Sequence, residues 1–195
     1  MNKCPKKGRK KMIIINAFKH LGVVLHHKWW VLKLCTKVGL IKQGILHDLS
    51  KFSPTEFIPS AKYYNEGKES PITKEKRMKV YSKAWLHHKG RNKHHPEYWY
   101  DLYGEEKKYT TPIIPFKYVC EMICDQISAG IVYEGKNWDK THQLKYWTKQ
   151  KENMFIDERI KKVLDIVYAQ LAKDGIDKTI TKKNLRNIYE DCIKG

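Results

Sequence analysis

The chain has 195 residues, 41% of them hydrophobic and 12% aromatic, and a formal net charge of +18. This apolar content excludes an intrinsically disordered protein, because a disordered chain of such charge lacks the apolar surface that offsets the entropy lost on folding. The five cysteines include no Cys-x-x-Cys pair, which argues against a disulfide framework and against a cysteine zinc site. The charge favours polyanionic partners such as nucleotides, nucleic acid or anionic lipid, unless the lysines are merely solvated.

A basic N-terminal segment leads into a short apolar run, residues 12–15, which ends at Asn16 and Lys19. A membrane span needs roughly 20 apolar residues, so this run is too short to cross a bilayer. We therefore expect a soluble, cytoplasmic protein with no membrane partner.

Apolar residues recur at the helical period along most of the chain, and the first such stretch stops at Gly39. Ser53, Pro54 and Glu56 are typical of a helix start, with a capping serine, a proline at the first position and a glutamate at the third. These patterns predict helices over residues 14–38, 41–49, 54–64, 73–88, 116–133, 142–150, 156–173 and 182–193, and loops over residues 65–71 and 101–115.

No alternating strand pattern of useful length interrupts these helices, so the predicted fold class is all-α. We expect one helical domain over residues 1–135 and a basic helical extension over residues 136–195. Cations of the extension either form a nucleic-acid surface or are only solvated on the outer faces of amphipathic helices. These cations are Lys149, Lys151, Lys161, Lys162, Lys182, Lys183 and Arg186.

Eight of the nine histidines fall into three groups. Imidazole and carboxylate ligands together suit first-row transition metals, and His47 is followed directly by Asp48, which places both ligand types side by side. Asp125 lies inside an apolar helix, where an isolated charge is costly, so it is either a metal ligand or neutralised by Lys117 or Arg91. The groups are His20, His26 and His27, then His47 alone, then His87, His88, His94 and His95.

Geometry selects among the histidines of the first helix. If the first two helices form an antiparallel hairpin, residues equally far from the turn meet at the same height, because each helix rises ~1.5 Å per residue. His47 lies eight residues after Gly39, whereas His27 lies twelve and His20 nineteen residues before it. His27 is therefore the preferred ligand. The side chain of His26 points about a quarter-turn away, so we expect it to contact the ligands without binding the metal. His20 is expected either to contact the ligands in the same way or to face the substrate.

Residues 47–51 read His-Asp-Leu-Ser-Lys, follow a histidine on the preceding helix, and precede a lone aspartate in the apolar segment 119–129. Over residues 20–133 this arrangement resembles the HD-domain superfamily of metal-dependent phosphohydrolases. The resemblance implies an all-α, HD-like helical bundle that binds one or two divalent ions, Mn, Fe, Co, Ni or Zn, through His27, His47, Asp48 and Asp125. The later histidine pairs are similar to those of binuclear branches, which implies further ligands at His88, His94 and His95.

The whole sequence also resembles an uncharacterised group of bacterial and phage proteins that share the HDLSK and LHHKGRNKHH segments, a similarity that implies no activity. Within the second segment, Trp85 and Leu86 take the apolar face, so we prefer His88 to His87 as the ligand and place His87 behind it. The alternative is a polar loop whose histidines are satisfied by backbone or solvent.

The resemblance implies hydrolysis of a small phosphorylated substrate, a nucleotide or another phosphate ester. Asp48 is expected to hold the ion that activates water. Lys51, one turn later, is expected to project toward the same site as a catalytic or substrate-binding residue. Lys89, Arg91 and Lys93 flank the histidines and are expected to bind phosphate, Arg91 through two parallel hydrogen bonds.

Glu121 lies one turn before Asp125 and has two interpretations: it orients a ligand histidine, or it is a solvated helix residue. Two other functions stay open. Some HD-fold enzymes with six such ligands are di-iron oxygenases, so the ligand set alone does not choose the reaction. The third alternative is a basic helical nucleic-acid-binding protein in which the histidines are structural.

Overall fold

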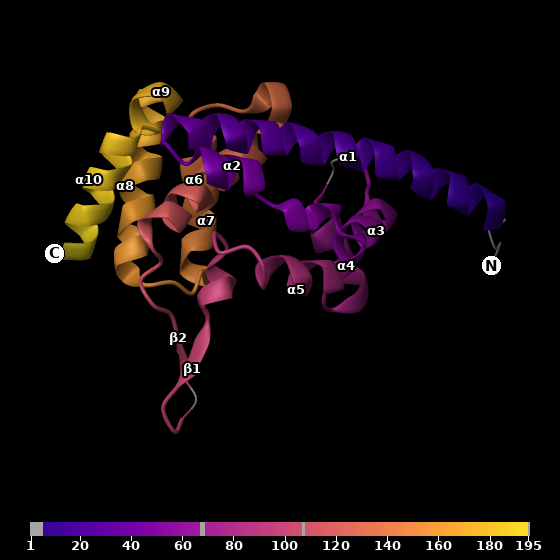
Figure 1. Ribbon diagram of the computed structural model, residues 1–195, viewed down its shortest axis with the longest axis horizontal. Coiled ribbons are helices and arrows are strands. Elements are labelled where there is room, and N and C mark those ends of the chain that lie inside the picture. Colours follow the sequence, from indigo (N-terminus) through magenta and orange to yellow (C-terminus); the bar gives the residue numbers. More distant parts are fainter. Residues whose placement is uncertain (1–5, 67–68, 107, 195) are drawn as a thin grey trace. The chain divides into compact units, whose positions relative to one another are not determined.

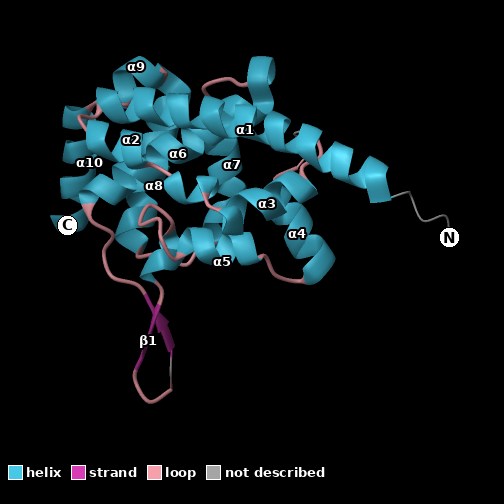
Figure 2. Ribbon diagram, turned by 45° about the vertical axis from the view of Figure 1, so that its right-hand side comes forward, coloured by secondary structure: helices cyan, strands magenta, loops and turns pink. Residues whose placement is uncertain are grey.

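The computed structural model describes residues 6–66, 69–106 and 108–194. Helices dominate this part of the chain, and its strands form a single two-stranded hairpin (Figures 1 and 2). The predicted all-α fold class is therefore confirmed. None of the described helices combines the length and the apolar character that crossing a membrane requires.

The elements alternate long helices with short single-turn pieces. The α-helices are α1 (Lys6–Lys37), α2 (Ile41–Leu46), α3 (Pro54–Tyr63), α4 (Pro71–Lys79), α5 (Lys83–Lys89), α6 (Phe116–Glu134), α7 (His142–Gln150), α8 (Glu158–Asp174), α9 (Ile176–Thr179) and α10 (Lys182–Lys194). The 3-10 helices are η1 (Leu49–Phe52), η2 (Pro96–Trp99), η3 (Gly135–Asn137) and η4 (Lys151–Asn153), and the strands are β1 (Asp101–Tyr103) and β2 (Lys108–Thr110).

The chain divides into two compact units, which are described one at a time. Unit 1 contains the residues up to His27 together with Asp48–Arg91. Unit 2 contains Lys28–His47 and the residues from Asn92 onward. The expected domain boundary after residue 135 stays a prediction.

In unit 1, α4 and α5 both pack against α3. Pro54 occupies the first position of α3, as predicted, but the side chain of Ser53 makes no capping hydrogen bond. The carbonyl of Ser53 instead accepts from the backbone N–H groups of Glu56 and Phe57, at 3.1 and 2.8 Å. The predicted capping role of Glu56 is wrong, because its carboxylate is buried and turned toward the histidines of α5.

The single helix predicted over residues 73–88 is wrong: the structure breaks it into α4 and α5. Val80 has a positive φ of 70° with ψ at -30° and ends α4. Ser82 then begins α5, because its hydroxyl accepts a hydrogen bond from the backbone N–H of Trp85 at 3.0 Å. The same hydroxyl donates to Oε2 of Glu75 at 2.6 Å. Two local side-chain bonds thus outweigh the helical period of the apolar residues.

In unit 2, α7 and α10 pack against α8, and α6 contacts both α7 and α10. The helices predicted over residues 116–133, 142–150 and 182–193 are confirmed to within one residue. The short α9 was not predicted. The largest fully buried side chains of this core include Trp147, Tyr168, Met122 and Leu164.

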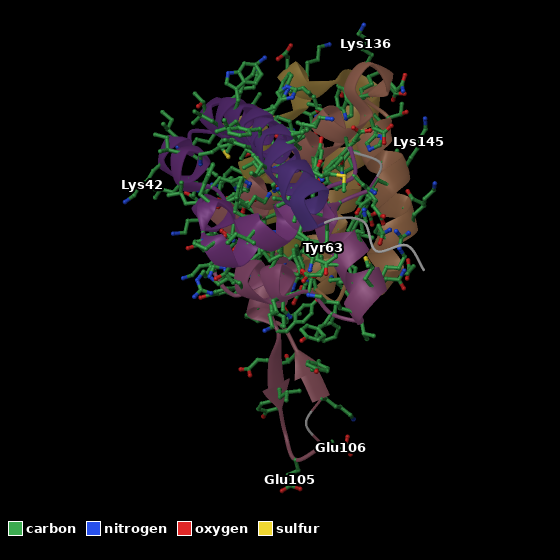
Figure 3. All side chains as sticks on the ribbon, turned by 90° about the vertical axis from the view of Figure 1, so that its right-hand side faces the viewer. Lys42, Tyr63, Glu105, Glu106, Lys136 and Lys145 are labelled. Carbon is green, nitrogen blue, oxygen red and sulfur yellow. The ribbon has the colours of Figure 1, made fainter. Side chains whose placement is uncertain are left out.

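The loop predicted over residues 101–115 contains the antiparallel hairpin of β1 and β2, in which Leu102 pairs with Tyr109. Figure 1 shows the hairpin projecting from the helices of unit 2, and Figure 3 shows Glu105 and Glu106 at its tip. All six strand residues are exposed, so the alternation of buried and exposed side chains that marks a strand in a sequence is missing.

The turn between α1 and α2 is compact. A Cβ atom added to Gly44 would lie 3.0 Å from both Cβ of Cys35 and Cα of Leu32, so glycine lets α2 lie directly on α1. Lys28 holds the end of α2, because its Nζ donates to the carbonyl oxygens of Ile45 and His47 at 2.6 and 2.8 Å. The helix predicted over residues 41–49 therefore ends early, and the His-Asp pair lies in a turn.

Candidate metal centre

Each unit contains a cluster of histidines and carboxylates. His47 is the last residue of a unit 2 segment, and Asp48 is the first residue of a unit 1 segment. The consecutive pair that suggested a metal site in the sequence therefore contributes one residue to each cluster.

In unit 2, Glu121 holds two histidines through one carboxylate oxygen. Its Oε1 lies 3.0 Å from Nδ1 of His47 and 3.2 Å from Nδ1 of His94. All three side chains are buried, and their ligand atoms are close enough together to hold a metal ion. Gln43 donates from Nε2 to the other oxygen of Glu121 at 3.4 Å. Glu121 is therefore the centre of a polar network, and the alternative in which it is solvated is wrong.

The opposite nitrogens of the same two imidazoles face Asp125. Nε2 of His47 lies 3.3 Å from Oδ1 of Asp125, and Nε2 of His94 lies 3.9 Å from Oδ2. Glu121 and Asp125 are four residues apart on α6, so they project from the same face. One helix thus supplies the carboxylates for both sides of the paired rings.

The protonation of this cluster follows from Glu121. Burial raises the pKa of its carboxyl, but hydrogen bonds with His47 and His94 outweigh burial and lower the pKa to about 2. An ionised carboxylate accepts hydrogen bonds, so each imidazole donates to Glu121 from its Nδ1–H group. The Nε2 atoms then face the carboxylate of Asp125. Two imidazole nitrogens and one carboxylate are a donor set that suits a first-row transition metal. A second carboxylate that accepts a hydrogen bond from the other ring nitrogen commonly orients such histidine ligands.

His94 reaches the cluster through a tight turn before η2. The backbone N–H of His95 donates to the carbonyl of Asn92 at 3.1 Å, which closes the turn. The ring centroids of His94 and His95 lie 4.3 Å apart. The structure therefore brings four of the predicted ligands together in unit 2: His47, His94, His95 and Asp125.

Unit 1 repeats the arrangement around Glu56. Its two oxygens lie 2.6 Å from Nδ1 of His87 and 2.8 Å from Nδ1 of His88. Nε2 of His88 lies 3.4 Å from Oδ1 of Asp48. Burial raises the pKa of Glu56, but hydrogen bonds with His88 and then His87 lower the pKa overall. A buried glutamate again orients two histidines, and the far nitrogen of one of them faces an aspartate.

Asp48 combines a strained backbone with a close cation. Its φ of 52° and ψ of 31° lie in the left-handed region, which few residues other than glycine adopt. Such conformations cluster at functional sites, where the surrounding structure holds them in place. Oδ2 of Asp48 lies 2.6 Å from Nζ of Lys51, so Lys51 projects toward Asp48.

The remaining histidines of α1 differ in environment. His27 is 8% exposed, whereas His26 is exposed. His20 packs against Phe57 and Tyr64, with ring centroids 5.7 and 6.0 Å away. Burial, and then the charge of Lys51, lower the pKa of His20 to about 4, so this imidazole is neutral at physiological pH.

The expected phosphate-binding cations lie at the edges of the clusters. The exposed guanidinium of Arg91 donates to the carbonyl of His87 at 3.4 Å, and Lys89 is half-buried on α5. In unit 2, Nζ of Lys93 lies 5.4 Å from the ring centroid of Tyr98 and 5.8 Å from that of Tyr118. These cations leave their charge available to an anion at the protein surface.

A family model matches residues 16–170, which include every predicted ligand and both glutamates. The chain belongs to DUF5662, a family of unknown function. No curated protein and no solved structure gives a significant match.

Two residues of the unit 1 cluster, Glu56 and Ser50, were missed or misjudged from the sequence. Glu56 stands at the third position of a helix that begins with Ser53 and Pro54, which is also the pattern of a capping box. Ser50, whose Oγ lies 3.3 Å from Nδ1 of His88, gave no signal at all. A glutamate on a helix that packs near a pair of histidines is the feature that would have pointed to Glu56 and Glu121.

Proposed function

We propose that this protein is a metal-dependent phosphohydrolase that acts on a nucleotide or another small phosphate ester, with an HD-like arrangement of its ligands. The observation that carries the proposal is the arrangement found in each unit: a buried glutamate holds two histidines at Nδ1, and an aspartate lies 3.3–3.9 Å from Nε2 of one or both of them. Burying carboxylates costs free energy, so two such arrangements would destabilise a protein in which they served only to pack the core.

Five side chains are the first candidates to hold divalent ions. In unit 2 they are Nε2 of His47 and His94 and the carboxylate of Asp125, and in unit 1 they are Nε2 of His88 and the carboxylate of Asp48. His27 and His95 are the further candidates that the sequence suggests. When bound, such an ion activates water as the nucleophile and offsets the charge that develops on the phosphoryl oxygens.

The residues of the chain itself supply orientation and charge. Glu121 and Glu56 fix the tautomers of the histidines and keep the Nε2 atoms directed at the aspartates. Lys51 holds Asp48 at 2.6 Å and brings a cation to the same place. Arg91 and Lys93 supply further positive charge for phosphoryl oxygens. A phosphate ester therefore matches both the donor set and the cations around it.

Phosphate release tests this proposal. Purified protein is assayed with Mn²⁺, Fe²⁺, Co²⁺, Ni²⁺ or Zn²⁺ against a panel of nucleotides and simple phosphate esters. We expect metal-dependent release that is lost in Asp48→Asn, a substitution that keeps the side-chain size and tolerates the left-handed backbone. Asp191→Asn, at an exposed position of α10, is the matched control and should retain full activity.

Three results would contradict the proposal. Phosphate release that is equal in Asp48→Asn and wild type would remove Asp48 from the reaction. Two bound irons with oxygen consumption and no phosphate release would assign the ligands to a di-iron oxygenase. Absence of bound metal together with steeply salt-dependent nucleic-acid binding would favour a protein without catalysis.

A further inference from the structure

The turn between α4 and α5 exposes three large side chains. Val80 is 94% exposed, Met78 is 65% exposed and Tyr81 is 51% exposed. Val80 also has a φ of 70°, which is strained for a β-branched residue. Strain of this kind persists only where neighbouring structure enforces it. The conformation of this turn is therefore enforced by the surrounding residues of unit 1.

Buried polar groups fix both ends of this turn. Glu75, which is 2% exposed, accepts a hydrogen bond from the hydroxyl of Ser82 at 2.6 Å and pairs with Nζ of Lys79 at 3.1 Å. Ser82 in turn caps the first turn of α5 through the backbone N–H of Trp85. Lys79 and Ser82 flank Val80 and Tyr81, so these bonds hold the chain on both sides of the two exposed side chains.

The same segment is strongly basic. Residues 71–91 contain seven lysine and arginine residues and a single acidic residue, the buried Glu75. Glu75 balances Lys79, and Glu69 pairs with Arg77 at 2.6 Å. The charge of the segment still exceeds what these two carboxylates offset. Its cations are Lys74, Lys76, Arg77, Lys79, Lys83, Lys89 and Arg91.

We propose that this corner of unit 1, residues 74–83, binds single-stranded nucleic acid. Proteins that bind single strands combine cations that follow the phosphates with an aromatic side chain on which a base stacks, and Tyr81 surrounded by lysines supplies both. Met78 and Val80 add apolar contact next to the stacked base. This binding does not depend on the proposed hydrolysis, because neither Tyr81 nor the lysines belong to the metal clusters.

An anionic bilayer is the competing occupant, and the structure favours nucleic acid over it. A helix that lies on a membrane presents a continuous apolar face, whereas this corner offers three exposed large side chains in one turn. Its cations are spread along α4 and α5, which suits the repeated charge of a strand. Tyr81 is 51% exposed, so its ring is accessible to a base.

Fluorescence anisotropy with a labelled oligothymidylate about 16 nucleotides long tests the proposal in the full-length, metal-free protein. We expect Tyr81→Ala to weaken binding by about 5- to 150-fold, the range for loss of one stacked base, and Tyr81→Phe to retain it. Tyr146→Ala is the matched control, since Tyr146 is 50% exposed on α7, and it should bind like wild type.

Salt dependence separates the phosphate contacts from the stacking. For Lys74→Ala combined with Lys83→Ala, the slope of log K against log salt should fall by about 1.4, which corresponds to two lost phosphate contacts on a single strand. Lys136→Ala and Lys145→Ala together are the control, because both lysines lie on unit 2 (Figure 3). That control should leave the slope unchanged.

The proposal is overturned if the protein does not bind the oligonucleotide at low salt, or if Tyr81→Ala and Tyr146→Ala bind it equally well. It is also overturned if Tyr81→Ala abolishes binding to phosphatidylserine-containing vesicles while the oligonucleotide is not bound, which would identify a membrane-contact site. Circular dichroism of each variant checks that the fold is intact.

Discussion

Replacing Glu121 by glutamine should weaken metal binding in unit 2 without disrupting the fold. The substitution preserves size, and its amide oxygen can take the place of Oε1, which lies 3.0 Å from His47 and 3.2 Å from His94. Only the negative charge is lost. The amide nitrogen then takes the place of Oε2 beside Gln43, whose own amide can turn to accept from it.

The magnitude follows from the number of hydrogen bonds. A hydrogen bond to a charged group is worth about 1.5–3 kcal/mol and a neutral one about 0.5–1.5 kcal/mol, so each of the two imidazoles loses about 1 kcal/mol. Because these bonds make the Nε2 atoms better donors to a cation, we expect a loss of about 2 kcal/mol in binding, or roughly 30-fold in affinity.

Competition between the protein and a chromophoric chelator for Zn²⁺ measures this affinity. Glu134→Gln is the control, because Glu134 is exposed at the end of the same helix and should leave the affinity unchanged. A Glu121→Gln protein that binds Zn²⁺ as tightly as wild type would refute the reasoning.

Four further substitutions have defined outcomes. Glu56→Gln should lower metal affinity roughly 5-fold in unit 1, because only one of its two histidines, His88, is a candidate ligand and it loses about 1 kcal/mol; the same Zn²⁺ competition measures the change. Gly44→Ala should destabilise the fold by about 1–3 kcal/mol in urea unfolding, because the new Cβ lies 3.0 Å from Cβ of Cys35. Gly22→Ala should instead stabilise it by about 0.4–1 kcal/mol, since a Cβ there meets no atom within 4 Å. His20 should make the protein acid-sensitive: its pKa falls from 6.5 in the unfolded chain to about 4 in the fold, so the unfolded state binds the extra proton and stability falls as the pH drops through this window, by up to about 3 kcal/mol. In His20→Gln, urea unfolding at pH 7 and pH 4.5 should lack this component of the loss.

Each of these has a contrary result. Equal stability of Gly44→Ala and Gly22→Ala would mean that α2 does not lie tightly on α1. An unchanged pH dependence in His20→Gln would mean that His20 is not neutral in the folded protein. Unaltered Zn²⁺ affinity in Glu56→Gln would separate Glu56 from metal binding.

The long amphipathic helices could be predicted from the sequence because their cores repeat at one period. The helix that carries Glu121 and Asp125 is an example, since apolar residues surround both carboxylates at helical spacing. The break after α4 could not be predicted in this way. It depends on the bond between Glu75 and Ser82, seven residues apart, and on the positive φ of Val80, and neither leaves a periodic signal.

The ligand types of the candidate site were visible in the sequence, but their partners were not. His47, His94 and Asp125 were predicted from residue type and clustering, and the structure brings them together in unit 2. Glu56 was assigned to a helix cap because its position in α3 fits that role equally well. Whether a helical glutamate faces solvent or a histidine depends on tertiary packing, which a single sequence does not encode locally.

The metal content of the protein, purified without chelators and measured by inductively coupled plasma mass spectrometry, tests the central claim most directly. We predict one or two first-row divalent ions per chain in wild type, and loss of bound metal when His47→Gln and Asp48→Asn are combined in a protein whose circular dichroism is unchanged. A wild-type protein that contains no metal and binds none on titration, or a double variant with the wild-type metal content, would contradict the account.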